Sequence, residues 1–166
     1  MVVSVRKIVM ALSVVAILAS ANRSSAMMLD GSLPLTGIVV TQTGPNLAVS
    51  AMIRSAFTIV TGPGMGDYAP IPLLTNFGPH TLNLTSVANL IANFSLSNAA
   101  FGTFVPTSAE IIDRQTNFLD ISFVGTFTPG ASLPGFDPSE TTILRISINQ
   151  SGRSLSEAIT LNSVPV

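Results

Sequence analysis

Apolar and polar residues alternate with a period of two along several stretches of this 166-residue chain. The most regular stretch is 118–127. One of its faces carries Leu119, Ile121, Phe123 and Phe127, and the other carries Asp120, Ser122 and Thr126. A period of two is that of a β-strand with one buried face. The pattern therefore predicts a strand whose apolar side packs on a core and whose polar side, including Asp120, is exposed.

A second alternating stretch, near the C-terminus, predicts a β-hairpin. Leu144, Ile146 and Ile148 alternate with Arg145, Ser147 and Asn149, which predicts a buried and an exposed face. The turn-like segment 150–153 separates this strand from a returning strand at 155–161. Glu157 interrupts the alternation of the returning strand, and an inward charge is typical of an exposed edge or a bulge. We therefore expect an edge strand there.

Residues 38–60 predict a pair of antiparallel strands. The apolar residues of 47–60 share one parity, which indicates one long strand, or two strands joined by a kink near Arg54 or Ser55. These apolar residues are Leu47, Val49, Ala51, Ile53, Phe57 and Ile59. Residues 38–43 are expected to pair with this strand across a turn at 44–46. The following segment, 61–79, is rich in glycine and proline and is predicted to be a long loop outside the sheet interior.

The segment 86–94 leaves two alternatives open, because its apolar residues fit a helical stripe as well as a strand. Shorter strands are predicted at 101–105 and 110–115, and Pro106 and Pro129 are each expected to end a strand. About seven short strands, without regular alternation with helices, predict an all-β fold. We expect an antiparallel β-sandwich or a barrel-like domain with at most one short helix.

The first 26 residues predict a secretory signal peptide. Arg6 and Lys7 precede an apolar run at 8–19, and small residues follow it. The run is shorter than the roughly 20 residues that cross a membrane as a helix, so we expect cleavage and no stable membrane span afterwards. Cleavage after Ala21 and cleavage after Ala26 are both possible, and the second is favoured. Residues 27–166 then form a single all-β domain.

Charge and cysteine content narrow the function classes. From Met27 onward the chain has four arginines, eight acidic residues and no lysine, which gives a formal charge of minus four. A mildly acidic domain lacks the basic patch that binds nucleic acid or anionic lipid. The chain has no cysteine, which excludes disulfides, thiol nucleophiles and thiolate metal sites.

The C-terminal third carries several short, turn-rich patterns. They are GTFTP at 125–129, LPGFDP at 133–138, QSG at 150–152 and a Val-Pro pair at 164–165. With the leader, this region resembles exported bacterial proteins that carry a PEP-CTERM sorting signal. The sequence ends at Val166 without the Pro-Glu-Pro tripeptide, apolar segment and basic tail of that family. The resemblance implies a secreted or cell-surface bacterial protein and carries over no catalytic residues.

Few side chains suggest catalysis. The only histidine, His80, follows Phe-Gly-Pro at the end of the long loop and is predicted to be solvated, so we expect His80→Ala to leave the fold intact. Glu110, Asp113 and Asp120 could supply the paired carboxylates of a glycoside hydrolase, but alternation places them on solvated strand faces and ends. The sequence therefore predicts no catalytic residue and no enzyme activity.

Metal and sorting motifs are also weak. Asp67, Asp137 and Glu140 lie in predicted loops and carry the oxygen ligands that calcium prefers, but their spacing matches no calcium-binding loop. The LPLTG sequence at 33–37 matches a sortase signal, yet it lies near the start of the exported chain rather than near its end. We predict no metal or cofactor site and regard the LPLTG match as chance.

These patterns predict an exported, non-catalytic protein of the cell surface or extracellular matrix, with an adhesive or structural role. Its expected partners are extracellular polysaccharide or other surface proteins, and nucleic acid is not among them. The alternative is a small-ligand or carbohydrate-binding β-sandwich module, although aromatic platforms for sugars are scarce in a chain with one tyrosine and no tryptophan. A hydrolase is a minor alternative.

Overall fold

A computed structural model of the protein describes residues 27–164, except for the side chain of Glu140. The predicted signal peptide and both cleavage sites lie outside these residues. Within 27–164, no helix has the length and apolar character needed to span a membrane. The elements in chain order are β1 (Met27–Met28), β2 (Gly31–Gln42), β3 (Met52–Val60), β4 (Met65–Gly66), β5 (His80–Asn83), α1 (Val87–Asn93), β6 (Leu96–Asn98), β7 (Gly102–Arg114), β8 (Phe118–Pro129), β9 (Phe136–Asp137), β10 (Ser139–Ser151) and β11 (Ser154–Ser163).

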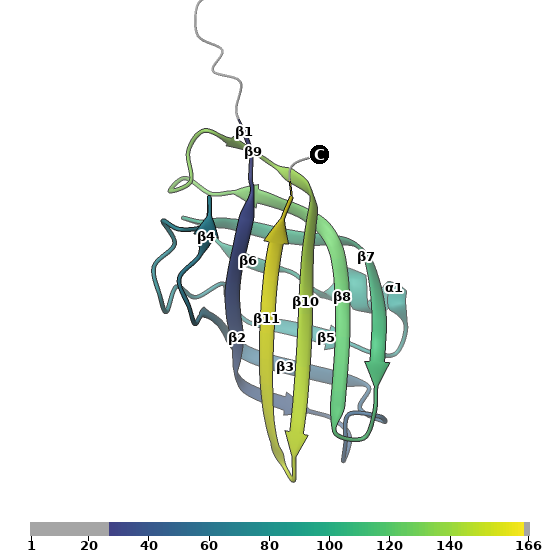
Figure 1. Ribbon diagram of the computed structural model, residues 1–166. Coiled ribbons are helices and arrows are strands. Elements are labelled where there is room, and N and C mark those ends of the chain that lie inside the picture. The colour runs from purple at the N-terminus through teal and green to yellow at the C-terminus, as the bar shows by residue number, and fades with distance from the viewer. Residues whose placement is uncertain (1–26, 165–166) are drawn as a thin grey trace, which may run out of the picture.

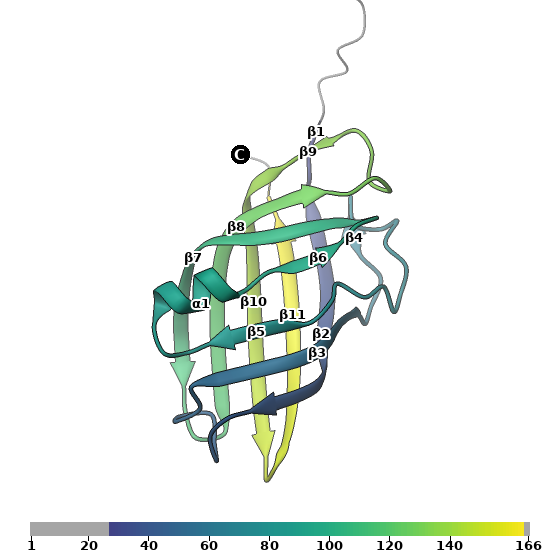
Figure 2. The same cartoon turned by 180° about the vertical axis from the view of Figure 1, so that it is seen from behind.

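The main sheet is antiparallel and has the strand order β5-β3-β2-β11-β10-β8-β7-β6, with β4 paired to β2 beside this path. The sheet curls so that β3, β5 and β6 cross behind the long strands β2, β11, β10 and β8 (Figures 1 and 2). The Ser97 N–H at β6 donates to the Phe77 carbonyl just before β5, at 2.9 Å, and brings the two ends of the sheet together. The prediction of an all-β, barrel-like fold is confirmed.

The core lies inside the curled sheet, where the predicted apolar faces of β8 and β10 meet. Every predicted core residue of these strands is fully buried, namely Leu119, Ile121, Phe123, Phe127, Leu144, Ile146 and Ile148. Helix α1 covers part of this interior and buries Leu90, and Phe94 just after it stacks on Phe123 with ring centroids 4.4 Å apart. Of the two alternatives for 86–94, the helix is therefore correct.

The C-terminal hairpin is confirmed, but its expected position at a sheet edge is wrong. Strands β10 and β11 are joined by the two-residue turn Gly152-Arg153, between the paired residues Ser151 and Ser154. Strand β11 then lies between β10 and β2, so both of its edges are hydrogen-bonded. Glu157 points into the core and is only 3% exposed.

Polar residues of the outer face show one further departure. Arg145 is exposed as predicted, and Ser147 is half-buried. Asp120 is buried, contrary to expectation, because the Arg145 side chain covers it: Nε donates to Asp120 Oδ1 at 3.0 Å. The Ser147 hydroxyl also donates to the same carboxylate.

The predicted strand at 47–60 is shorter than expected. Residues 47–51 form a turn, and β3 begins at Met52. Its inward face changes phase at Ala56, so that Ser55 and Thr58 are both buried while Phe57 is 48% exposed. Opposite this point, β2 contains Val39 with a positive φ of 56°. Val39 and Ala56 thus form a local distortion of both strands. The register of β2 with β3 is the same before and after it.

The predicted long connection is confirmed, whereas the expected end of a strand at Pro106 is wrong. Residues 61–79 form the connection, in which the two-residue β4 pairs with β2 and Asn76 makes a single bridge to Ile59 of β3. The predicted strands at 101–105 and 110–115 are one strand, β7, which continues through Pro106. A register shift between Pro106 and Ser108 accommodates the proline, because a bulge needs no ladder hydrogen bond at that position. The prediction that Pro129 ends a strand is confirmed.

Candidate functional site

Four polar side chains from three strands meet inside the sheet, and we call them the polar cluster: Ser55 and Thr58 of β3, His80 of β5, and Glu157 of β11. The His80 Nε2 atom lies 2.9 Å from Glu157 Oε1, and its Nδ1 atom lies 2.8 Å from Thr58 Oγ1. The Ser55 hydroxyl donates to the second carboxylate oxygen, Glu157 Oε2. Both carboxylate oxygens and both ring nitrogens therefore have partners, as buried polar groups require.

The prediction of a solvated loop histidine is wrong. His80 is the first residue of β5 rather than the end of a loop, and it is 4% exposed. Its register partner in β3 is Ser55, which brings it into the core beside Glu157 of β11. Local sequence could not show this, because 77 residues separate His80 from Glu157. The one available signal was Glu157 itself, a charge at an inward position of an alternating strand.

The polar cluster has the order hydroxyl, imidazole, carboxylate that nucleophilic enzymes use. A catalytic hydroxyl must also reach a substrate. Thr58 is fully buried, and the side chains of His80 and Glu157 are completely inaccessible to solvent. The cluster is therefore a structural feature of the folded chain, in which these groups satisfy one another.

Gly37 makes room for the Glu157 carboxylate. A Cβ atom at this position would collide with Glu157 Oε2 and with the Ser55 hydroxyl, so a larger residue would displace the carboxylate from its present place. Gly37 is also the register partner of Glu157, and this is the last pair between β2 and β11 in the direction of the β10–β11 turn. The Thr36 hydroxyl, one residue earlier, donates to the Glu157 carbonyl. The polar cluster thus lies where β2 and β11 stop pairing.

Beyond this last pair the two strands separate. Strand β2 turns away through Val39, whose positive φ is a rare conformation for a β-branched residue, and it continues beside β3. Strand β11 continues with β10 to the hairpin turn. Strained backbone of this kind persists only where the surrounding structure enforces it, and it is frequent at binding sites.

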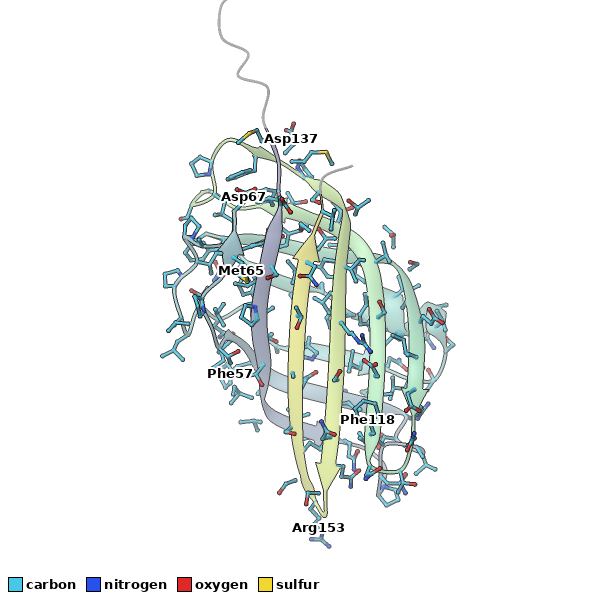
Figure 3. The ribbon with its side chains drawn as sticks, in the orientation of Figure 1. Phe57, Met65, Asp67, Phe118, Asp137 and Arg153 are labelled. Carbon is cyan, nitrogen blue, oxygen red and sulfur yellow. The ribbon has the colours of Figure 1, made fainter. Side chains whose placement is uncertain are left out.

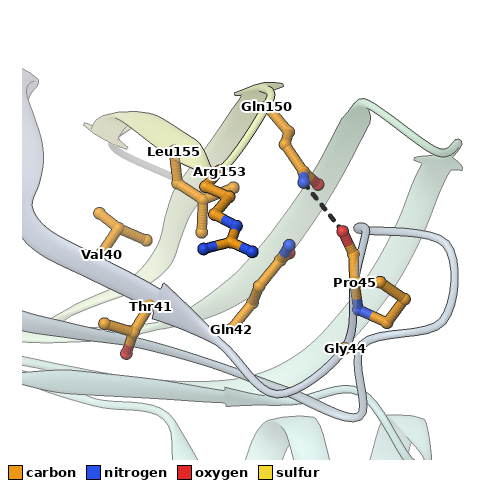
Figure 4. Close-up of a pocket in the computed structure, with 8 residues that line it drawn as sticks. All are labelled: Val40, Thr41, Gln42, Gly44, Pro45, Gln150, Arg153 and Leu155. Atoms are coloured by element: carbon orange, nitrogen blue, oxygen red, sulfur yellow. Dashed lines mark hydrogen bonds between the residues drawn. The ribbon is translucent and has the colours of Figure 1, made fainter.

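The separation of the strands forms a cleft at this end of the sheet, which we call the end cleft. Its volume is about 470 Å³. Figure 4 shows Val40 and Leu155 on one side, Gln150 and Pro45 on the other, and the Arg153 guanidinium between them, directed toward Gln42. The complete lining is Val40, Thr41, Gln42, Gly44, Pro45, Gln150, Arg153 and Leu155.

Two glutamines are held in place at the end cleft. Gln150 Nε2 donates to the carbonyls of Pro45, at 3.1 Å, and Gly152, at 2.8 Å, which ties the hairpin to the β2–β3 connection. Gln42 Oε1 accepts a hydrogen bond from the Ser50 hydroxyl. Sequence analysis identified Gln150 and Arg153 only as turn residues, because the β2 residues that complete the cleft are more than 100 positions away.

Two of the three predicted acidic candidates are register partners on neighbouring strands, Asp113 of β7 and Asp120 of β8. Glu110 is exposed, while Asp113 lies opposite the buried Asp120, which is paired with Arg145. Hydrogen bonds from Arg145 hold the pKa of Asp120 below its usual value, although partial burial acts in the opposite direction. The negative charge of Asp120 is thus compensated by Arg145. The group does not resemble the general acid of a glycosidase, whose pKa is raised.

Of the three residues considered for calcium, Glu140 has a side chain that lies outside the described part of the structure. Asp67 accepts the backbone N–H of Asp30 at 2.8 Å and thereby fixes the loop beside β4. Asp137 is exposed in β9. Among the described side chains, no group of three or more histidine, cysteine or acidic residues is arranged to hold a metal ion. The LPLTG sequence forms part of β2, with Leu33 and Leu35 in the core.

Comparisons with protein-family models, with curated proteins and with solved structures found no match. They leave the resemblance to PEP-CTERM-type proteins as a prediction. Function is therefore inferred from the geometry of the chain itself.

Proposed function

We propose that this protein is an exported, non-catalytic binding protein of the bacterial cell surface or matrix, which holds a small polar ligand or one unit of a polysaccharide in the end cleft. The observation that carries this proposal is the cleft itself. It forms where two long neighbouring strands part, beside a strained residue, and fixed polar side chains line it. A concave site with a few oriented polar groups is the usual form of a small-molecule site.

The chemistry of the end cleft favours binding over reaction. Its lining holds no histidine, carboxylate or tyrosine that could transfer a proton, and its one charged side chain is that of Arg153. The histidine of the chain is sealed inside the polar cluster. Export and a surface location are supported by the predicted signal peptide and by the resemblance of the C-terminal third to sorted surface proteins.

Ligand-observed NMR with the exported protein tests this proposal. Pools of monosaccharides, oligosaccharides and small organic acids are added, and binders are identified by saturation transfer. We expect at least one binder whose signal is lost in Leu155→Trp, because the larger side chain fills the end cleft. The matched control is Val105→Trp, which enlarges an exposed residue on β7 and should retain binding.

Two results would contradict the proposal. One is the absence of any binder, or binding that Leu155→Trp leaves unchanged. The other is conversion of a bound compound during prolonged incubation, seen as new resonances that depend on the protein. That second result would favour the hydrolase alternative.

A further inference from the structure

The end cleft contains a positively charged group that the described part of the chain leaves without an anionic partner. Arg153 occupies the second position of the two-residue β10–β11 turn, after Gly152, whose positive φ of 60° suits this turn. Ion pairs among the described side chains involve only His80 with Glu157 and Arg145 with Asp120. The Arg153 guanidinium is therefore available to a ligand.

Two of the other three arginines in 27–164, Arg114 and Arg145, show what a structural arginine looks like in this fold. Arg114 donates through Nε to the Leu47 carbonyl at 3.1 Å and through Nη2 to the Ser50 carbonyl at 2.6 Å, which anchors the β2–β3 connection. Arg145 is bound by Asp120 through two nitrogens. Arg153 makes no such bond to a described residue, although the hairpin places it at the mouth of a cleft (Figure 4).

The surroundings of Arg153 favour an anion. None of the eight lining residues is acidic, in a domain where acidic residues outnumber basic ones two to one. Figure 3 shows Arg153 at one end of the molecule and Asp67 and Asp137 at the other. A guanidinium presents a planar set of donors that can bind both oxygens of a carboxylate at once.

The neighbouring amides favour hydroxyl groups on the same ligand. Gln42 is held through Oε1, which accepts from the Ser50 hydroxyl, whereas its Nε2 donates to no described residue. An amide nitrogen in this state has the capacity to donate to a ligand hydroxyl. Val40 and Leu155 supply an apolar surface for the ligand body.

We propose that the end cleft binds a hydroxylated carboxylate, such as a uronic acid unit, through an ion pair with Arg153. This inference rests on the proposed binding function and adds the chemical class of the ligand. The same chemistry is offered by a free sugar acid and by a uronate residue of an acidic polysaccharide. The arms of the experiment separate these two sources.

The test uses the exported protein labelled with ¹⁵N, and D-galacturonate, D-galactose and oligogalacturonate as probes. Titration to about 20 mM covers affinities in the millimolar range. We expect galacturonate to shift the Arg153 Nε–Hε signal and the Gln42 side-chain amide, and to bind at least about tenfold more tightly than galactose. Added salt should weaken this binding, because a solvent-exposed ion pair is screened. Tighter binding of the oligomer than of the monomer would identify polysaccharide as the source.

Variants decide whether Arg153 carries the interaction. Arg153→Gln should reduce galacturonate affinity about tenfold, whereas Arg153→Lys keeps the charge and should lose less. The matched control is Arg54→Gln, which removes an exposed arginine from the neighbouring hollow beside β3 and β5 and should change little. This hollow shares only Thr41 with the end cleft. Circular dichroism verifies that each variant is folded.

Three outcomes would overturn the inference. They are the absence of galacturonate shifts, equal binding of galactose, and unchanged affinity in Arg153→Gln. If a neutral ligand still binds and Leu155→Trp blocks it, the proposed function stands while the carboxylate inference is wrong. If Arg54→Gln alone removes binding, the anion site lies in the other hollow and the inference is equally wrong.

Discussion

Removing either member of the buried His80–Glu157 pair should strongly destabilise the fold. In Glu157→Ala, His80 Nε2 and the Ser55 hydroxyl each lose the carboxylate oxygen to which they are bonded, and neither has solvent access to replace it. An unsatisfied buried group costs about 1–3 kcal/mol, and this change leaves two such groups beside the space of the lost side chain. We therefore expect Glu157→Ala to lower the free energy of unfolding by about 3–5 kcal/mol.

This loss is large against a total stability of about 5–15 kcal/mol for a domain of ordinary size. His80→Ala should cost a similar amount, because it leaves Glu157 Oε1 and Thr58 Oγ1 without their ring partner. The sequence alone predicted that this histidine was dispensable for folding, and its burial reverses that expectation. Urea unfolding followed by circular dichroism measures these losses, provided that the slope with urea stays constant across variants.

The double variant identifies the cause of the loss. Because both single changes remove the same contact, His80→Ala combined with Glu157→Ala should cost less than the two separate losses together, by about 0.5–3 kcal/mol. Replacing both residues by leucine should be less harmful than Glu157→Leu alone, since two apolar side chains leave no unpaired charge. Single losses below about 1 kcal/mol, or strictly additive losses, would refute the reasoning.

Two further predictions concern a core phenylalanine and the ionisation of a buried tyrosine. Phe123→Ala should lower the free energy of unfolding by about 3–5 kcal/mol, because the ring is fully buried and stacked on Phe94. Phe57→Ala, on the exposed face, should lower it far less. Equal losses in urea unfolding would contradict the assigned register. Burial raises the pKa of Tyr68 well above its usual value, so stability should fall as pH rises beyond about 10, where tyrosine ionises in the unfolded chain. Residues 27–166 contain no lysine or cysteine, so Tyr68→Phe should abolish this fall, and a fall that persists would assign it to another group.

The sheet was predictable wherever one face of a strand packs on the core and the other meets solvent. Strands β8 and β10 meet this condition, and their alternation identified the buried residues correctly. The condition fails in β3, where the face changes phase at Ala56 opposite the strained Val39. Such a distortion depends on how the sheet curls, and the apolar pattern of 47–60 contains no trace of it.

Polar residues were misplaced for a different reason. Asp120 lies on the outer face of β8, as predicted. Its exposure also depends on side chains of the neighbouring strand, and Arg145 of β10 covers its carboxylate. His80 and Glu157 satisfy each other only after three strands have come together. Pairing of this kind is a property of long-range contacts, and a single sequence does not encode it in any local pattern.

The polar cluster and the end cleft are two consequences of one local arrangement. Because Gly37 has no side chain, the Glu157 carboxylate can occupy the space beneath β2 and bond to Ser55 and His80 on the strands that follow. These bonds hold β11, β3 and β5 together at the last β2–β11 pair. Beyond this pair, β2 turns away through Val39 and β11 continues to the hairpin. The end cleft lies between the two diverging strands, and the bonds of the polar cluster fix the point at which they diverge. The polar cluster, whose disruption should lower stability, is therefore also the element that positions the strands lining the end cleft.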